Sequence, residues 1–129
     1  MLAPLYPLMI LHAHITYEGS FVETLHNICS WDRELNDANF TKRLKHSIDT
    51  KGMLNPILVM SLENYLTTYQ DPTNDKHVDY TKPYVCMIGN NRYLYAKTHG
   101  YTHIECLLIN DPEELRNMTR NTLIKPRKM

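Results

Sequence analysis

The residues best suited to chemistry form a short run, Gly89-Asn90-Asn91-Arg92, between an apolar segment and a segment with helical spacing. Glycine adopts positive φ and lets a ligand approach the backbone closely. A helix that begins directly after it offers free backbone N–H groups and the positive end of its dipole. Arg92 adds a planar guanidinium suited to two hydrogen bonds with a phosphate. The run therefore predicts a phosphate-binding loop; the simpler alternative is a glycine turn followed by a solvated arginine.

A second stretch, "LKHSIDTKGMLNPILV", lies earlier in the chain. It combines the patterns L-x-x-S-I and G-x-x-[NQ]-P-[IL], and the later run has the form G-x-x-R-x-x-A before a helix. The order of these patterns along the chain, from Thr41 to Ile109, resembles that of the ParB/sulfiredoxin superfamily. The resemblance is in particular to its ParB-like nuclease domains. The residues that carry them are Leu44, Ser47 and Ile48, then Gly52, Asn55, Pro56 and Ile57, then Gly89, Arg92 and, at an altered spacing, Ala96.

The resemblance implies a compact α/β domain that binds a nucleoside triphosphate, ATP or CTP, together with Mg²⁺. It places the G-x-x-R loop on the phosphates, the Asn-Pro turn beside it, and a helix serine near a phosphate oxygen. Lysines of the same helix would add positive charge or would simply be solvated. The implied nucleotide-binding residues are Gly89, Asn90, Asn91, Arg92, Asn55, Pro56, Ser47 and Lys45, with Lys51 as a further lysine of the helix.

Two departures from the family pattern bear on activity. Sulfiredoxins have Cys-His before the arginine, whereas this chain has Asn90 and Asn91, so it lacks the thiolate nucleophile and is not expected to be a sulfiredoxin. Neutral amides also cannot serve as a general base. The resemblance implies Asp32 and Glu34 as candidate catalytic residues, because they precede the Ser47 helix, where kinase-like members of the superfamily place an acid. They would act as a general base or Mg²⁺ ligand, against the alternative of solvated loop acids.

Two functions remain open on these grounds. In the first, which the glycine and arginine favour slightly, the protein is an enzyme of phosphate esters: an NTPase, a phosphotransferase or a nuclease. In the second, which the amides favour, it is an inactive module that binds a protein or DNA partner. Partitioning proteins carry a DNA-binding helix-turn-helix domain after this region, and the chain ends too soon for one. A stand-alone core of the kind found in bacteriophage genomes is the expectation.

Length and composition predict one domain for residues 1–129, with a divergent part at 1–40, a motif-bearing core at 41–109 and a basic tail at 122–129. Acidic and basic residues balance at 14 each, so DNA binding would need a local patch such as the tail. Three cysteines, an odd number without CxxC spacing, predict reduced thiols and a cytoplasmic protein. The apolar N-terminus is too short to span a membrane and contains prolines.

Hydrophobic spacing and turn signals predict an α+β fold, a small mixed sheet flanked by helices. Residues 18–31 fit either a strand or a short helix. A polar loop, Ser61–Pro83, is expected to project its tip, Asp71–Lys76, away from the phosphates and toward a partner or a second subunit. The expected strands are Met9–Thr16, Ile57–Met60, Tyr84–Ile88 and Thr102–Ile109, and the expected helices are Asn39–Lys51, Asn91–His99 and Pro112–Asn121.

His12 and His14 lie on one face of the first expected strand, because side chains alternate along a strand. Two imidazoles at this spacing can hold a transition metal when a third ligand is present. The sequence offers no recognisable third ligand, so a polar strand face is favoured and no metal site is assigned.

Overall fold

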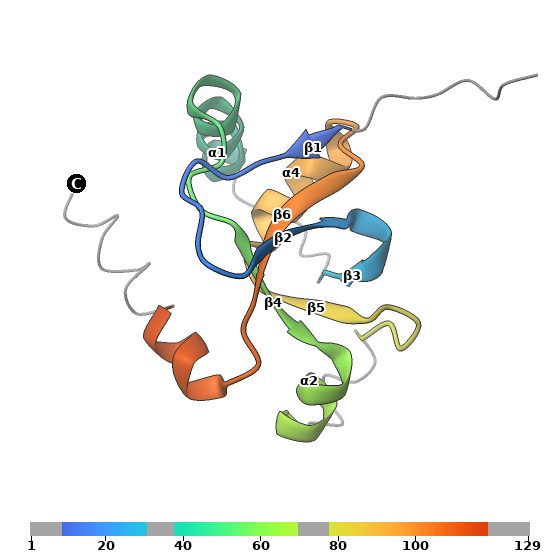
Figure 1. Cartoon of the computed structure of the whole chain (residues 1–129). Helices are drawn as coiled ribbons and strands as arrows, with labels where there is room; N and C mark the ends of the chain where they lie inside the picture. The colour runs from blue at the N-terminus through green and yellow to red at the C-terminus, as the bar shows by residue number, and fades with distance from the viewer. Residues whose placement is uncertain (1–8, 31–37, 70–77, 119–129) are drawn as a thin grey trace, which may run out of the picture.

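The computed structural model describes residues 9–30, 38–69 and 78–118, and these form one six-stranded mixed sheet with helices around it (Figure 1). The strand order is β1-β6-β4-β5-β3, and β2, which lies off this path, also pairs with β6. The β4–β5 and β2–β6 pairs are antiparallel, and the remaining pairs are parallel. The strands are β1 (Ile10–Leu11), β2 (Ser20–Thr24), β3 (Ile28–Cys29), β4 (Ile57–Ser61), β5 (Tyr84–Ile88) and β6 (His103–Leu108).

The sheet is strongly curled. β2 and β3 are separated in the chain only by the single turn η1 (Leu25–Asn27), yet they pair with strands far apart in the sheet. A short connection can join both only if the sheet bends back on itself. The ring of Phe21 in β2 accordingly lies 5.5 Å from the ring of Tyr84 in β5.

Two apolar clusters cover the two faces of this sheet. The first joins the strands to α1 (Ala38–Lys51) and α4 (Asn90–Thr98), through buried residues such as Ile48, Ile57 and Ala96. The second joins them to α2 (Leu62–Thr68) and to a helix at residues 112–118. The candidate site lies on the side of the first cluster.

The predicted α+β architecture is confirmed, as is the prediction that Ile57–Met60 and Tyr84–Ile88 belong to one sheet. The predicted strand Met9–Thr16 is wrong in its length, because β1 ends at Leu11, where its pairing with β6 stops. Beyond that point the chain bends toward the end of α1, where the N–H groups of His14 and Ile15 donate to the carbonyls of Met53 and Leu54.

The predicted loop after β4 is also corrected, since it begins with helix α2. Ser61 caps this helix by accepting a hydrogen bond from the N–H of Asn64 (3.2 Å), and Tyr65 is buried in the second cluster. The predicted loop tip, residues 71–76, lies outside the described residues, as do residues 119–121 of the last predicted helix and the basic tail. No helix within the described ranges is long and apolar enough to cross a membrane.

Candidate functional site

Gly89 ends β5 and precedes α4 with a φ of +104°, in the left-handed region. A Cβ at this position would lie 2.6 Å from Cγ2 of Ile57, because the turn packs directly onto the start of β4. Only glycine satisfies both the backbone angle and this contact. Within the described residues no side-chain cap hydrogen bond is made at the N-terminus of α4, and the first N–H groups of a helix have no partner inside the helix itself.

Arg92 lies in the first turn of α4 and is partly buried. Its Nη1 donates to the carbonyl oxygen of Asn55 at 2.9 Å, and no Asp or Glu of the described residues forms an ion pair with it. Burial lowers the pKa of its guanidinium, which nevertheless stays protonated at neutral pH. The site therefore holds a partly desolvated cation whose partner is a neutral carbonyl, and an anion would compensate its charge.

The Asn55-Pro56 turn is fixed from two sides. Its backbone carbonyl accepts from Arg92, and the side-chain oxygen of Asn55 accepts from the hydroxyl of Tyr17 at 3.0 Å. Pro56 is fully buried. The contribution of Tyr17 was not predicted, because a contact between residues 38 positions apart leaves no local signal in the sequence.

Asn90 has a structural role in the loop. Its side-chain oxygen accepts from the hydroxyl of Ser30 at 2.6 Å, and its amide nitrogen lies 3.5 Å from the carbonyl oxygen of Cys86. These contacts connect the loop to the end of β3 and to β5. The part played by Ser30 was also not predicted. Of the two amides before Arg92, Asn91 is the one that faces open space.

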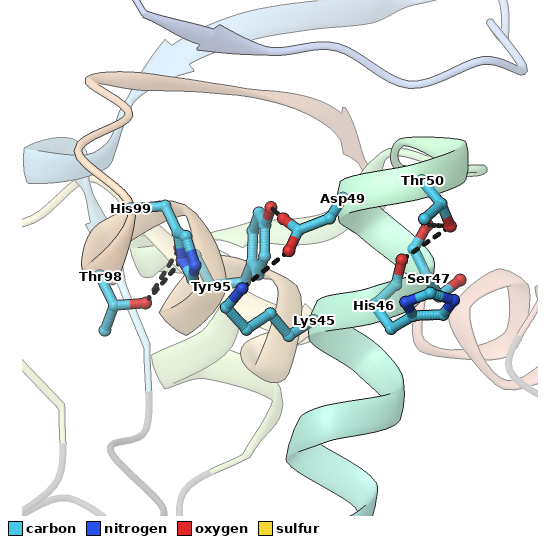
Figure 2. Close-up of polar contacts among 8 residues, drawn as sticks. All are labelled: Lys45, His46, Ser47, Asp49, Thr50, Tyr95, Thr98 and His99. Atoms are coloured by element: carbon cyan, nitrogen blue, oxygen red, sulfur yellow. Dashed lines mark hydrogen bonds and ion pairs between the residues drawn. The ribbon is translucent and has the colours of Figure 1, made fainter.

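That space is a pocket of about 130 Å³ between α1 and α4. Figure 2 shows the polar residues beside it, with Asp49 of α1 at the centre. Lys45 donates to one oxygen of Asp49 at 2.8 Å, and the hydroxyl of Tyr95 donates to the other. The Tyr95 ring stacks on His99 with centroids 4.0 Å apart. The pocket is lined by Leu44, Lys45, Asn91, Leu94, Tyr95, Thr98 and His99.

The electrostatics of this network leave Asp49 a poor base. The hydrogen bond from Lys45, supported by that from Tyr95, holds the pKa of Asp49 below its usual value. Burial and the bond to Asp49 raise the pKa of Tyr95 to about 12. At neutral pH the pair is a carboxylate and a neutral phenol, and both carboxylate oxygens are engaged.

The structure brings only some of the predicted site residues together. The structure places Arg92 and Gly89 in contact with the Asn55-Pro56 turn and the start of β4. Lys45 and Asn91 both line the pocket between α1 and α4. Ser47 is exposed on α1 and does not line the pocket; Figure 2 shows it beside His46 and Thr50, apart from Tyr95. Asp32 and Glu34 lie outside the described residues.

No family model matches the chain, and no curated protein matches it. Among solved structures it is similar to sulfiredoxin from Arabidopsis thaliana, with 23% identity, a TM-score of 0.45, and coverage of 76% of this chain and 93% of that one. It is also similar to the C-terminally truncated chromosome-partitioning protein ParB from Caulobacter crescentus complexed with CTP-γ-S. There the identity is 21%, the TM-score 0.48, and the coverage 70% of this chain and 44% of that one. These are the two kinds of protein that the motifs resemble.

Proposed function

We propose that the chain binds a nucleoside triphosphate, ATP or CTP, with its phosphates at the first turn of α4. The observation that carries this proposal is Arg92, a partly buried cation whose described partner is the neutral carbonyl of Asn55. An anionic oxygen near the N-terminus of α4 would pair with Arg92 and would lie at the positive end of the helix dipole. In this proposal Mg²⁺ accompanies the nucleotide, because it is commonly held through substrate phosphates with few protein ligands.

The remainder of the nucleotide would lie along the pocket between α1 and α4. This pocket begins at Asn91, one residue before Arg92, and continues along α4 to His99. At about 130 Å³ it is smaller than the several hundred Å³ usual for a complete ligand site. It would therefore hold part of the nucleotide and leave the rest exposed to solvent.

Binding without turnover is the function that these residues support best. The amide of Asn90 is engaged with Ser30, and Asp49 is held ionised with both oxygens occupied. Neither provides a general base at the phosphates. The enzyme alternative would depend on Asp32 or Glu34, and it predicts turnover of labelled nucleotide or plasmid DNA that disappears in Arg92→Ala.

Isothermal titration calorimetry with ATP and with CTP, each with Mg²⁺, tests the binding proposal. Arg92→Ala should weaken binding by about 1.5–3 kcal/mol, the range for a hydrogen bond to a charged group, or roughly ten- to a hundredfold in Kd. Arg92→Lys keeps the charge and loses the planar fork, so an intermediate loss is expected.

Arg116→Ala is the matched control for loss of positive charge. This arginine pairs with Glu113 (3.2 Å) on the helix at residues 112–118, and its removal should leave the affinity unchanged. Thermal melts of each variant separate lost binding from lost folding, because Arg92 also supports the Asn55 turn. Absence of binding by both nucleotides at millimolar concentration would refute the proposal.

A further inference from the structure

An acidic residue, Asp49 of α1, lies beside the pocket between α1 and α4. Its Oδ2 accepts from Nζ of Lys45 at 2.8 Å, and its Oδ1 accepts from the hydroxyl of Tyr95 on α4. Figure 2 shows the carboxylate between these two donors. Both donors line the pocket, whereas Asp49 does not. A pocket proposed to receive phosphates is thus bordered by a carboxylate, which has the same sign of charge.

Lys45 is the single lysine or arginine among the described residues that line this pocket. It shares the pocket with Asn91, the residue before Arg92, so an anion that is bound at Arg92 and extends into the pocket would approach the Lys45 ammonium. A lysine carries its charge on a flexible four-carbon stem with three rotatable donors. Lys45 can therefore exchange one partner for another without a change in the backbone of α1.

The ion pair of Lys45 and Asp49 is easily broken, but Asp49 itself is held in place. The two side chains are 56% and 38% exposed, and exposed pairs one helical turn apart contribute little to stability. Tyr95 is buried, and its hydroxyl attaches the carboxylate to α4. The hydrogen bonds from Lys45 and Tyr95 hold the pKa of Asp49 below its usual value, so the group is a carboxylate at neutral pH. Lys45 can leave while Asp49 stays.

We propose that Asp49 regulates the nucleotide site as an internal competitor for Lys45. In the protein without nucleotide, Asp49 holds the Lys45 ammonium; when the triphosphate binds, its oxygens take Lys45 from Asp49. This inference rests on the proposed function and deepens it. Each nucleotide that binds must replace the contact between Lys45 and Asp49, so the carboxylate weakens binding although it does not line the pocket.

Calorimetric titration of Asp49→Asn with ATP and with CTP, each with Mg²⁺, tests the competitor. The amide keeps the size of the side chain and an oxygen that can accept from Tyr95, but it loses the charge that holds Lys45. The affinity should rise by about two- to fivefold, the factor that corresponds to an exposed ion pair. In a Lys45→Gln background the same substitution should give a clearly smaller gain, because no ammonium remains to be released. Equal gains in both backgrounds would indicate simple repulsion and would overturn the proposal.

Glu113→Gln is the matched control for the loss of a negative charge. This acid pairs with Arg116 at 3.2 Å on the helix at residues 112–118, and it does not line the pocket. Its removal should leave the affinity for both nucleotides unchanged.

A second measurement uses the wild type and so does not depend on the folding of a variant. Carbon–proton NMR spectra recorded during titration with ATP and Mg²⁺ should show the methylene next to the Lys45 ammonium shifting as the nucleotide binds. The spectrum of Lys45→Gln assigns that signal. A Lys45 signal that stays in place at saturating nucleotide would mean that Lys45 keeps Asp49 as its partner, and the competitor would be excluded.

The outcomes also separate this inference from the function on which it rests. Binding that requires Arg92 but is unchanged or weakened in Asp49→Asn overturns the competitor and leaves the nucleotide site standing. Absence of binding by the wild type and by Asp49→Asn alike, with ATP and with CTP, refutes the nucleotide site and the competitor together.

Discussion

At the scale of single residues, Gly89 is required for two independent reasons. Its φ of +104° disfavours any side chain, and a Cβ would lie 2.6 Å from the Ile57 side chain. The second reason is structural, so the glycine of this motif does not by itself indicate a ligand. Arg92 carries the functional argument, because its charge lacks an acidic partner in the described part of the chain.

Gly89→Ala should be strongly destabilising. Strain of about 1–2 kcal/mol from the left-handed backbone adds to about 1–3 kcal/mol from overpacking against Ile57. Gly100→Ala is the matched control, since Gly100 also has a positive φ (+79°) but nothing lies within 4 Å of the place its Cβ would take. It should lose only the strain. Urea unfolding measures both, and equal losses would show that the contact with Ile57 relaxes at no cost.

Sequence reasoning found the site residues that belong to local patterns and missed those that do not. Arg92 and Asn55 lie in short motifs whose backbone chemistry can be inferred from neighbouring residues. Tyr17 and Ser30 act through contacts 38 and 60 positions away in the chain. Their side chains become informative only when the curl of the sheet brings β2, β3 and the Asn55 turn together.

At the scale of elements, α1, β4, β5, α4 and β6 were predicted close to their observed bounds. β4 and β5 are short apolar runs, and a glycine or proline adjoins each of α1, β4, β5 and α4 in the sequence. Residues 18–31 left strand and helix open, and the structure contains both, as two strands joined by the turn η1. α2 was missed because its seven residues are mostly polar; Ser61 and the burial of Tyr65 define it.

The contact between α1 and α4 depends on Asp49 and Tyr95, and Tyr95→Phe tests it. Removing the hydroxyl should lower the melting temperature at neutral pH, because the phenol on α4 donates a hydrogen bond to the carboxylate on α1. The folded pKa of Asp49 is depressed, chiefly by the bond from Lys45. Its stabilising contribution is therefore present above the unfolded value near 3.8 and is lost as pH falls through the lower folded value.

Melting temperatures of the wild type and Tyr95→Phe should accordingly begin to approach each other below pH 3.8 and coincide once the pH has fallen through the lower folded pKa of Asp49. Thr98→Val changes a hydroxyl on the same helix that does not contact Asp49, and it controls for general effects on α4. A gap between wild type and Tyr95→Phe that is constant across acidic pH would show that the phenol acts through packing on His99 instead.

At the scale of the whole molecule, one curled sheet separates the two apolar clusters. α1 and α4 bury one face, and the proposed nucleotide site lies between them. Glu105, the one buried charged side chain of the described residues, belongs to the other face of β6.

The three cysteines report on the cooperativity of this sheet. Cys29, Cys86 and Cys106 lie on β3, β5 and β6, and all three side chains are buried. Burial raises the pKa of Cys86 to about 12 and the pKa of Cys106 still further. In alkylation the thiolate is the nucleophile that attacks the reagent, so both cysteines should be almost unreactive at neutral pH while the sheet is intact.

We therefore expect labelling of the three thiols to follow global unfolding. Alkylation in increasing urea, with each cysteine resolved by peptide mass spectrometry, should give one common free energy of opening, because the strands that carry the thiols belong to a single sheet. The chain in high urea provides the intrinsic rates. Rapid labelling of Cys29 alone in native buffer would mean that β3 separates from β5 locally. The end of β3, where Ser30 donates to Asn90, would then be the part of the proposed phosphate loop that opens first.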